Sequence, residues 1–214
     1  MENIFHLKET ITSALYTCEN YEEWAGKFFS LIENLQPSHE LCQIIINGFI
    51  ESHLNRDYYY CFATWLGSTN VVFRSIFEKI FENLFESELP GEPDLHRIYE
   101  ETKFFARLIY ENSISWDVLS CIQLKANSSA VQEYFVTLLF LELSANFGKR
   151  TLCERLEESK SRNDFKGLFP KDNLDNTRFA IKIFELVDLH DLTHDLHAHI
   201  NEYELNCRIQ KLSL

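Results

Sequence analysis

The chain has 214 residues, of which 45% are hydrophobic, 14% aromatic and 25% charged, a composition typical of a folded globular protein. It holds only six glycines and four prolines, which favours long helices over short strands with tight turns. The formal net charge of −13 argues against a broad electrostatic surface for nucleic acid. One basic island stands out at residues 149–182, with 9 basic and 6 acidic residues, and a phosphate or an acidic partner would dock there.

The six cysteines, at positions 18, 42, 61, 121, 153 and 207, have apolar neighbours and form no C-x-x-C pair. This pattern is typical of buried, reduced thiols in a cytosolic or nuclear protein. The first ten residues, MENIFHLKET, are polar and unlike a signal peptide. The longest apolar run, residues 136–143, is too short to span a bilayer, so we expect no membrane association.

Apolar residues recur at three- and four-residue spacing along nearly the whole chain. In chain order, this spacing predicts helices over 4–15 and 24–35, and Pro37 ends the second. Ser38 is expected to cap a helix that runs through Phe49, and Asp57 to open one that runs through Leu66. A stripe of phenylalanines at 73, 77 and 81 predicts a further helix, which ends before the LPGEP segment at 89–93. We interpret this stripe as core between helices rather than as the lining of a ligand pocket.

After the proline-bounded break, the pattern predicts a helix over 95–109 and a short helical turn after Ser115. Ser128 and Ser129 are expected to cap the most apolar helix, which runs to Phe147 and ends at Gly148. The segment LCERL at 152–156 is followed by a polar stretch at 157–164, and helices near 174–187 and 191–209 come last. About ten helices with short loops and no period-two pattern predict an all-α fold of stacked antiparallel hairpins, a HEAT-like solenoid without exact repeats.

The segment LHDLTHDLHAHI at 189–200 contains four of the eight histidines, and its HDLTH resembles the H-E-x-x-H signature of zinc peptidases. A helix would place His190, His194 and His197 on one side. However, His190 and His197 would lie about 10 Å apart along the axis, and zinc ligands must come within about 2 Å of the metal. Asp191 is also shorter than the glutamate that serves as base in that motif. We therefore interpret the segment as a solvated helix face, with a zinc site as the weaker alternative.

The chain contains no phosphate-binding glycine loop and no nucleophile elbow. Pairs of glutamates stand at 22–23, 100–101 and 157–158. Because adjacent residues point apart on a helix, we interpret these pairs as solvated charges rather than as an acid and a base. We expect no catalytic residue, no cofactor and no metal, and hence no enzyme.

The stretch FKGLFPKDNLDNTRFAIKIFELVDLHDLTHDLHAHI, residues 165–200, resembles the C-terminal region of the nucampholin family, pre-mRNA-splicing factors also called Cwc-twenty-two. That region carries P-[RK]-D-N, here residues 170–173, and N-T-R-F-A-I, here residues 176–181. The segments LKETITSAL, NYEEWAGKFFSL and HELCQIIINGF look like the opening hairpins of the family's MA-three domain. Residues 98–124 look like the stretch in which a helix ends before a D-S-I-x-W turn, with Asn112 in place of the aspartate. The resemblance covers about residues 4–205.

The resemblance implies an MA-three-like hairpin domain at 1–120 and a helical extension packed on it at 121–214. It implies a non-catalytic scaffold of the spliceosome, in the nucleus, in contact with proteins of the U-five particle. The middle domain with which family members grip a DEAD-box helicase has no counterpart in these residues, so helicase loading is not carried over. The alternative is an MA-three module that binds a DEAD-box initiation-factor helicase and regulates translation. The element at 170–181 favours the splicing role, because MA-three domains of translation proteins do not generally carry it.

The candidate partner-binding residues lie in this element, where Pro170 precedes a turn-forming set and Asn173 or Asp175 can cap a helix that begins near Thr177. Arg178 lies in the first turn of that helix, where the helix dipole disfavours a cation unless it has a partner. The partner of Arg178 is either a carboxylate of this chain, a partner protein or an RNA phosphate. Residues 149–182 are the candidate region for contact with RNA phosphates. The candidate partner-binding residues are Lys171, Asp172, Asn173, Asn176 and Arg178.

Overall fold

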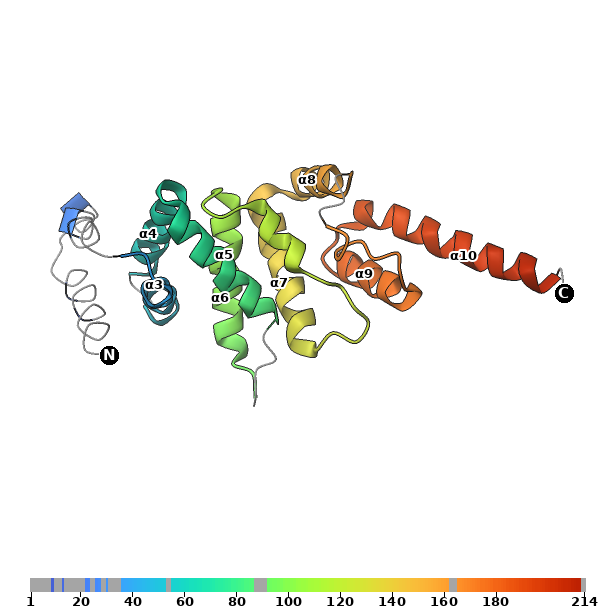
Figure 1. Cartoon of the computed structure of the whole chain (residues 1–214), viewed down its shortest axis with the longest axis horizontal. Helices are drawn as coiled ribbons and strands as arrows, with labels where there is room; N and C mark the ends of the chain where they lie inside the picture. Colours follow the sequence, from blue (N-terminus) through green and yellow to red (C-terminus); the bar gives the residue numbers. More distant parts are fainter. Residues whose placement is uncertain are drawn as a thin grey trace. The chain divides into compact units, whose positions relative to one another are not determined.

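The structure, a computed structural model, describes residues 36–52, 55–86, 92–161 and 165–212 together with a few positions between 9 and 30. The helices expected over 4–15 and 24–35 fall largely outside these residues. All regular structure in the described ranges is helical, and no β-strand occurs there (Figure 1). The predicted all-α class is therefore confirmed. The chain divides into two compact units: unit 1 comprises residues 1–81 and 111–115, and unit 2 comprises residues 82–110 and 116–214.

Unit 1 contains α3 (His39–Glu51), α4 (Arg56–Thr69) and the first part of α5 (Val71–Glu86). Ser38 caps α3 as expected, because its hydroxyl accepts the N–H of Leu41 at 3.2 Å. α4 begins one residue before Asp57. α3 and α4 pack against each other around buried apolar side chains. The phenylalanine stripe of α5 belongs to the core as interpreted, since Phe73, Phe77 and Phe81 are all buried.

The segment 111–115, which follows α6 (Leu95–Tyr110), is the second part of unit 1. The helix ends where expected, and Asn112 adopts a left-handed φ of 56°, a conformation that asparagine tolerates well. The N–H of Ser115 then donates to Glu78 at 2.8 Å. Ser113 lies against Gly67 so closely that a Cβ there would be 2.4 Å from the Ser113 carbonyl oxygen. This close approach requires a glycine in α4.

Unit 2 is built around α7 (Ala130–Phe147), which contacts α6, α8 (Lys149–Ser161) and α9 (Leu174–Leu186). α7 begins with a capping box, in which Ser129 accepts the N–H of Gln132 at 3.2 Å and the Gln132 side chain accepts the N–H of Ser129 at 3.1 Å. Gly148, with a φ of 78°, ends it. Both boundaries were expected from the sequence.

α8 contains LCERL and the first part of the polar stretch at 157–164, for which the sequence predicted no element, since the helix continues to Ser161. Ser159 is buried, and its hydroxyl accepts the indole N–H of Trp116 at 3.2 Å. Trp116 belongs to the short 3-10 helix η1 (Trp116–Cys121). The expected helical turn after Ser115 is thus found, and it is tied to the part of α8 that the sequence left undefined.

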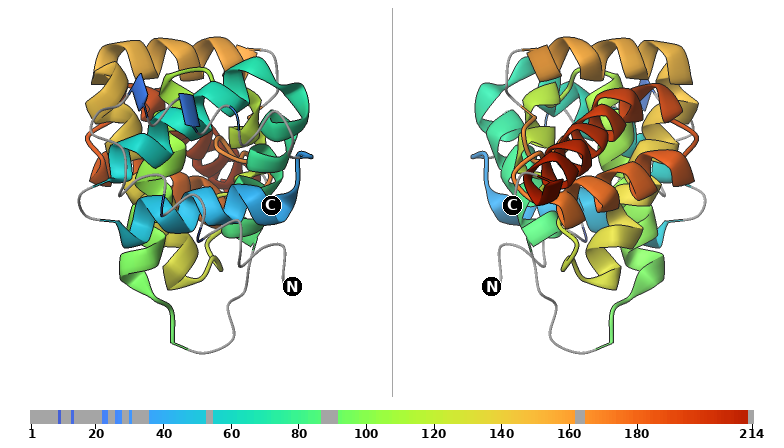
Figure 2. Two further views of the ribbon diagram at one scale, coloured as in Figure 1. Left: turned by 90° about the vertical axis from the view of Figure 1, so that its left-hand side faces the viewer. Right: turned by 90° about the vertical axis from the view of Figure 1, so that its right-hand side faces the viewer.

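The last helix expected, over 191–209, consists of the 3-10 helix η2 (His190–Thr193) followed by α10 (His194–Leu212). α10 contacts α9 and η2, and the right-hand view of Figure 2 shows α9 and α10 side by side. None of the described helices combines the length and the apolar composition that a membrane span needs.

The cysteines only partly follow the expected burial. Cys42 and Cys153 are buried, whereas Cys61, Cys121 and Cys207 are partly exposed, and Cys18 lies outside the described residues. Burial raises the pKa of the Cys42 thiol to about 12. Cys42 is therefore an inert core side chain rather than a nucleophile.

Candidate functional site

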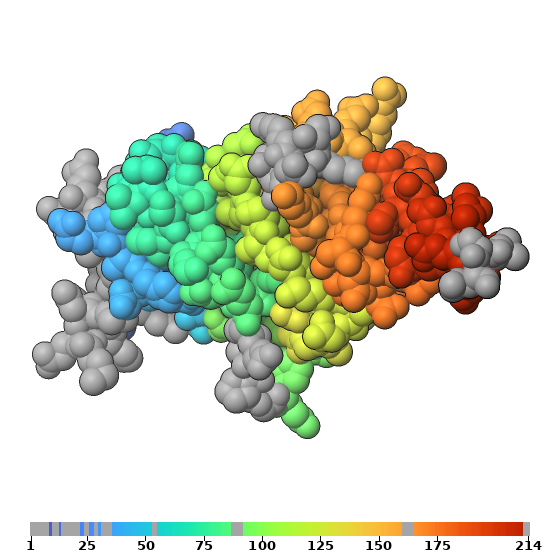
Figure 3. Space-filling view, turned by 45° about the vertical axis from the view of Figure 1, so that its right-hand side comes forward, coloured from blue at the N-terminus to red at the C-terminus, as the bar shows by residue number. Residues whose placement is uncertain are grey.

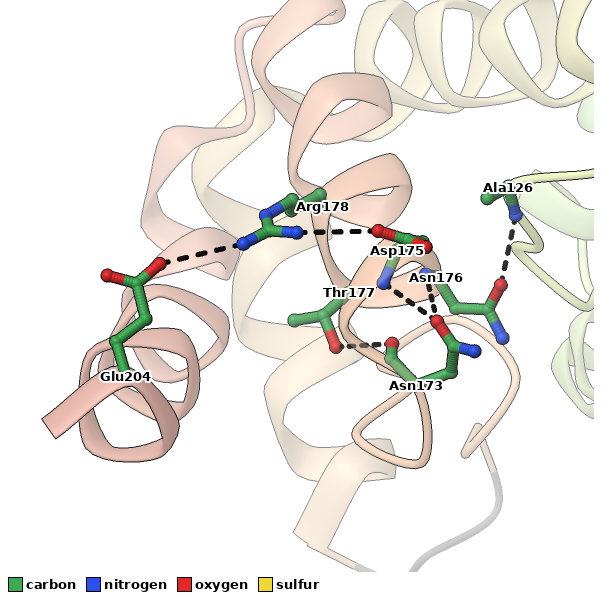
Figure 4. A network of polar contacts seen from close by, with 7 residues as sticks. All are labelled: Ala126, Asn173, Asp175, Asn176, Thr177, Arg178 and Glu204. Carbon is green, nitrogen blue, oxygen red and sulfur yellow. Dashed lines mark hydrogen bonds and ion pairs between the residues drawn. The ribbon is translucent and has the colours of Figure 1, made fainter. Parts of the chain in front are cut away.

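The candidate residues lie where an irregular segment enters α9, and their local hydrogen bonds decide which of them are available to a partner. Asn173 is the N-cap of α9, and its side-chain oxygen accepts the N–H groups of Asp175 at 2.8 Å and Asn176 at 3.3 Å (Figure 4). The helix begins at Leu174, which confirms the helix predicted near 174–187 and lies three residues before the start near Thr177 that was expected with the cap. Asn173, rather than Asp175, is the capping residue, and its side-chain oxygen is used in the fold of the segment.

Asn176 and Thr177 also hold the segment together. The Asn176 side chain accepts the N–H of Ala126 at 3.0 Å, which links α9 to the segment before α7 (Figure 4). The buried Thr177 hydroxyl lies 2.9 Å from the Pro170 carbonyl and 3.0 Å from the Asn173 carbonyl, so it can donate to either. Much of the NTRFA sequence therefore maintains local geometry.

Arg178 finds carboxylate partners within the chain. Its guanidinium lies 3.3 Å from Asp175 on the same turn and 3.5 Å from Glu204 on α10 (Figure 4). These pairs offset the unfavourable position of a cation in the first turn of a helix. All three side chains are exposed, so the contribution to stability is small, on the order of 1 kcal/mol or less.

Other cations of the basic island are paired in the same way. Lys149 pairs with Asp188, and Lys182 with Glu133. Arg150 forms a salt bridge with Glu154 at 2.9 Å within α8. Much of the island's positive charge is thus balanced inside unit 2.

Lys171 and Asp172 differ from the other candidates, because both are exposed and neither forms an ion pair with a described residue. They line a groove of about 440 Å³ in unit 2, to which residues 123–125, 166–167 and 169–172 contribute, together with Asn176. Lys125 and Lys166 line it as well, as do the buried side chains of Phe169 and Pro170. We call this the lysine groove. Figure 3 shows the chain around residue 125, in yellow, beside the chain around residue 170, in orange.

The two segments that form the lysine groove are held together closely. The N–H of Leu124 donates to the carbonyl of Gly167 at 2.9 Å. A Cβ at Gly167 would lie 2.2 Å from the Ile122 carbonyl oxygen, so this approach is available only to glycine. Gly167, Lys125 and Lys166 were not among the candidate residues predicted from the sequence. Lys125 stands far outside the basic island in sequence. Lys166 lies within the island but was not singled out, and the unusual FKGLFPKDN turn was the signal for Gly167.

The histidines do not converge on one centre. His190 lies in η2 and pairs with Asp188 at 3.1 Å, whereas His194 begins α10, with its ring nitrogen 2.8 Å from the Asp191 carbonyl. His197 lies 3.3 Å from Glu185. All three are exposed, in agreement with the solvated-face interpretation, although they do not share one helix. Within the described part of the chain, no three metal-ligating side chains form a group that could hold an ion.

The glutamates at 100–101 contradict their interpretation as solvated charges. Glu100 is 7% and Glu101 8% exposed, both in α6. Burial raises the pKa of Glu101, and the nearby Arg97 guanidinium, at 2.7 Å, opposes this effect. The pairs at 22–23 and 157–158 are exposed as expected.

A scan against models of known protein families finds no match. The chain is 33% identical over 197 residues to a pre-mRNA-splicing factor CWC22 homolog of Drosophila melanogaster, and 29% identical over 207 residues to one of Danio rerio. It is 30% identical over 195 residues to the male determiner protein Mdmd(Y) of Musca domestica. These matches cover 91–92% of this chain but only 14%, 20% and 16% of the respective relatives.

The chain thus corresponds to a fifth or less of the length of these curated relatives. The names agree with the resemblance to the nucampholin, or Cwc-twenty-two, factors that the PKDN and NTRFAI segments indicated. Since the similarity extends over nine tenths of the chain and includes homologues from several animals, the chain belongs to the CWC22 family of pre-mRNA-splicing factors.

Proposed function

We propose that this chain is a non-catalytic scaffold module of the spliceosome, which acts in pre-mRNA splicing in the nucleus through contacts with proteins of the U-five particle. The observation that carries the proposal is the 33% identity, over 91% of the chain, to a protein named as a splicing factor. The names of the homologues support a role in splicing and, with it, a nuclear place of action. The U-five contacts are the finer part of the proposal.

The arrangement of polar groups supports a binding role rather than catalysis. The histidines at 190, 194 and 197 each have a separate local contact. The polar groups of the element at 170–181 form a helix cap and links between segments. Of the five candidate residues, Lys171 and Asp172 are proposed to touch the partner. Asn173, Asn176 and Arg178 are proposed to keep the contact surface in shape. A direct contact of residues 149–182 with RNA phosphates is a further proposal. The division into domains at 1–120 and 121–214 stays a prediction, which fragments of the chain can test.

The test is affinity purification of the tagged chain from nuclear extract, followed by crosslinking and mass spectrometry. The expected result is recovery of U-five proteins, with crosslinks concentrated in residues 149–182. The double variant Lys171→Glu with Arg178→Glu, checked for unchanged helix content by circular dichroism, should recover less of them. Recovery of a cytoplasmic DEAD-box helicase alone would contradict the splicing proposal and favour the translational alternative.

A further inference from the structure

The cations around α9 and the lysine groove differ in whether they have carboxylate partners within unit 2. Lys149, Lys182 and Arg178 have carboxylate partners within the unit. Lys125 and Lys166, like Lys171, are exposed and form no ion pair with a described residue. These latter three lysines all line the lysine groove. Three cations that form no ion pair with a described residue thus gather at one concave place in an otherwise acidic chain.

The groove lining also contains apolar side chains, and hydrogen bonds fix the two segments that form it. Phe169 stacks on Phe184 of α9 with ring centroids 5.3 Å apart and an angle of 19° between the planes. Pro170 is buried beside it. The Leu124–Gly167 hydrogen bond and the Asn176–Ala126 hydrogen bond fix the two segments relative to each other. A ligand would therefore meet a preformed surface and lose little free energy to the ordering of the protein.

We propose that the lysine groove binds an acidic linear segment of a partner protein, one that carries an apolar side chain between its carboxylates. Lys125, Lys166 and Lys171 receive the carboxylates, and the apolar side chain packs against Phe169 and Pro170. The three lysines and Asp172 give the groove lining a formal charge of +2, against −13 for the whole chain. Charge complementarity of this kind sets both the partner and the rate of its encounter.

Within the lysine groove itself, the same observations disfavour a nucleic-acid strand. Asp172 stands among the lysines and repels a continuous row of phosphates. A bound polypeptide fits better, because its backbone N–H groups can donate hydrogen bonds to the Asp172 carboxylate.

This inference deepens the proposed function, because it names the chemistry of the partner contact at Lys171 and Asp172. Its test uses purified components and no spliceosome. Failure of peptide binding would therefore leave the association with splicing proteins standing, and absence of that association would leave a measured peptide affinity standing.

The probe is a fluorescein-labelled 12-residue peptide of glutamates with a leucine at every fourth position, measured by fluorescence anisotropy against the full chain. A twin peptide with glutamine in place of glutamate and a 12-nucleotide single-stranded oligouridine serve as comparison ligands. The test variant is Lys166→Glu with Lys171→Glu. The matched control is Arg208→Glu with Lys211→Glu, which makes the same change in charge at exposed positions of α10 outside the groove.

The expected result is binding of the acidic peptide that weakens about tenfold in the groove variant, changes far less in the α10 control and falls with added salt. The glutamine twin should bind more weakly than the acidic peptide. The proposal is overturned if the acidic peptide does not bind, if the two double variants behave alike, or if oligouridine binds more tightly than the peptide. Circular dichroism of each variant ensures that a loss of affinity is not a loss of fold.

Discussion

The carboxylate of Glu101 is buried in α6 with the Arg97 guanidinium 2.7 Å from it. Arg97 is itself partly exposed, so water screens part of its attraction. Burial disfavours the charged form more than Arg97 favours it, and the pKa of Glu101 is raised above its ordinary value of 4.5. In the pH range between 4.5 and the raised value, the folded state binds more protons than the unfolded state. The free energy of unfolding therefore falls as pH rises through this range.

Glu101→Gln removes this titration. We expect the variant to lose less stability than the parent chain when the pH rises from 4.5 toward neutrality, as measured by urea midpoints at several pH values. Glu111→Gln, at an exposed position beyond α6, is the control and should follow the parent. An unchanged pH slope in Glu101→Gln would mean that Glu101 is as well solvated in the fold as in the unfolded chain.

The close approach between α4 and the segment 111–115 can be tested by a substitution at Gly67. A methyl group there would lie 2.4 Å from a backbone oxygen, which cannot rotate away as a side chain can. Gly67→Ala should lower the free energy of unfolding by about 1–3 kcal/mol, although alanine is the better helix former. Gly26→Ala is the comparison, since its methyl group would meet nothing within 4 Å. Equal urea midpoints for the two variants would show that the segment can move aside.

The direction of adjacent side chains on a helix can be predicted from the sequence, but their burial cannot. That Glu100 and Glu101 point apart on a helix follows from their spacing. That both are buried does not, because burial depends on the elements that pack around α6. The same holds for Lys125 and Lys166, which lie 41 positions apart and meet at the lysine groove through the backbone bond between Leu124 and Gly167. Such contacts between distant segments carry no local signal.

At the scale of elements, local chemistry made several boundaries predictable. Ser38, Ser129 and Gly148 each stop or start a helix through their own side chain or backbone conformation, and each was identified from the sequence. The helix predicted near 174–187 is found as α9, but its capping residue was left open because Asn173 and Asp175 stand close together. α8 was not predicted as a helix, because its last turns are polar. The buried Ser159, in contact with Trp116, continues the buried side of Leu152 and Leu156 into these turns.

Two substitutions of Asn173 test whether its side-chain oxygen, as a hydrogen-bond acceptor, stabilises the start of α9. Asn173→Ala removes the acceptor of two N–H groups and should cost about 1 kcal/mol of stability. Asn173→Asp keeps an acceptor oxygen and adds a charge that a helix N-terminus favours, so it should retain the parent's urea midpoint. If both variants lose the same stability, the amide N–H₂ of Asn173 rather than its oxygen matters.

At the scale of the whole chain, α7 has an organising role in unit 2. Apolar residues lie on all sides of this helix, and it contacts α6, α8 and α9. The packing with α6 includes the T-shaped contact of Phe147 with Tyr110, at 5.0 Å between ring centroids. The expected domain boundary at residue 120 passes between these two helices. Unit 2 instead keeps them together and begins at residue 82.

The two divisions predict different behaviour of fragments. A fragment of residues 82–214 retains both α6 and α7, so we expect it to be helical and to unfold cooperatively in urea. A fragment of residues 121–214 lacks α6 and exposes the apolar side of α7 that packs against it, so we expect it to bind a hydrophobic dye and to unfold over a broad range. The whole chain is the reference for both. A sharp transition of the shorter fragment, with the midpoint of the longer one, would instead place the boundary at residue 120, because α6 would then contribute nothing to the stability of the extension.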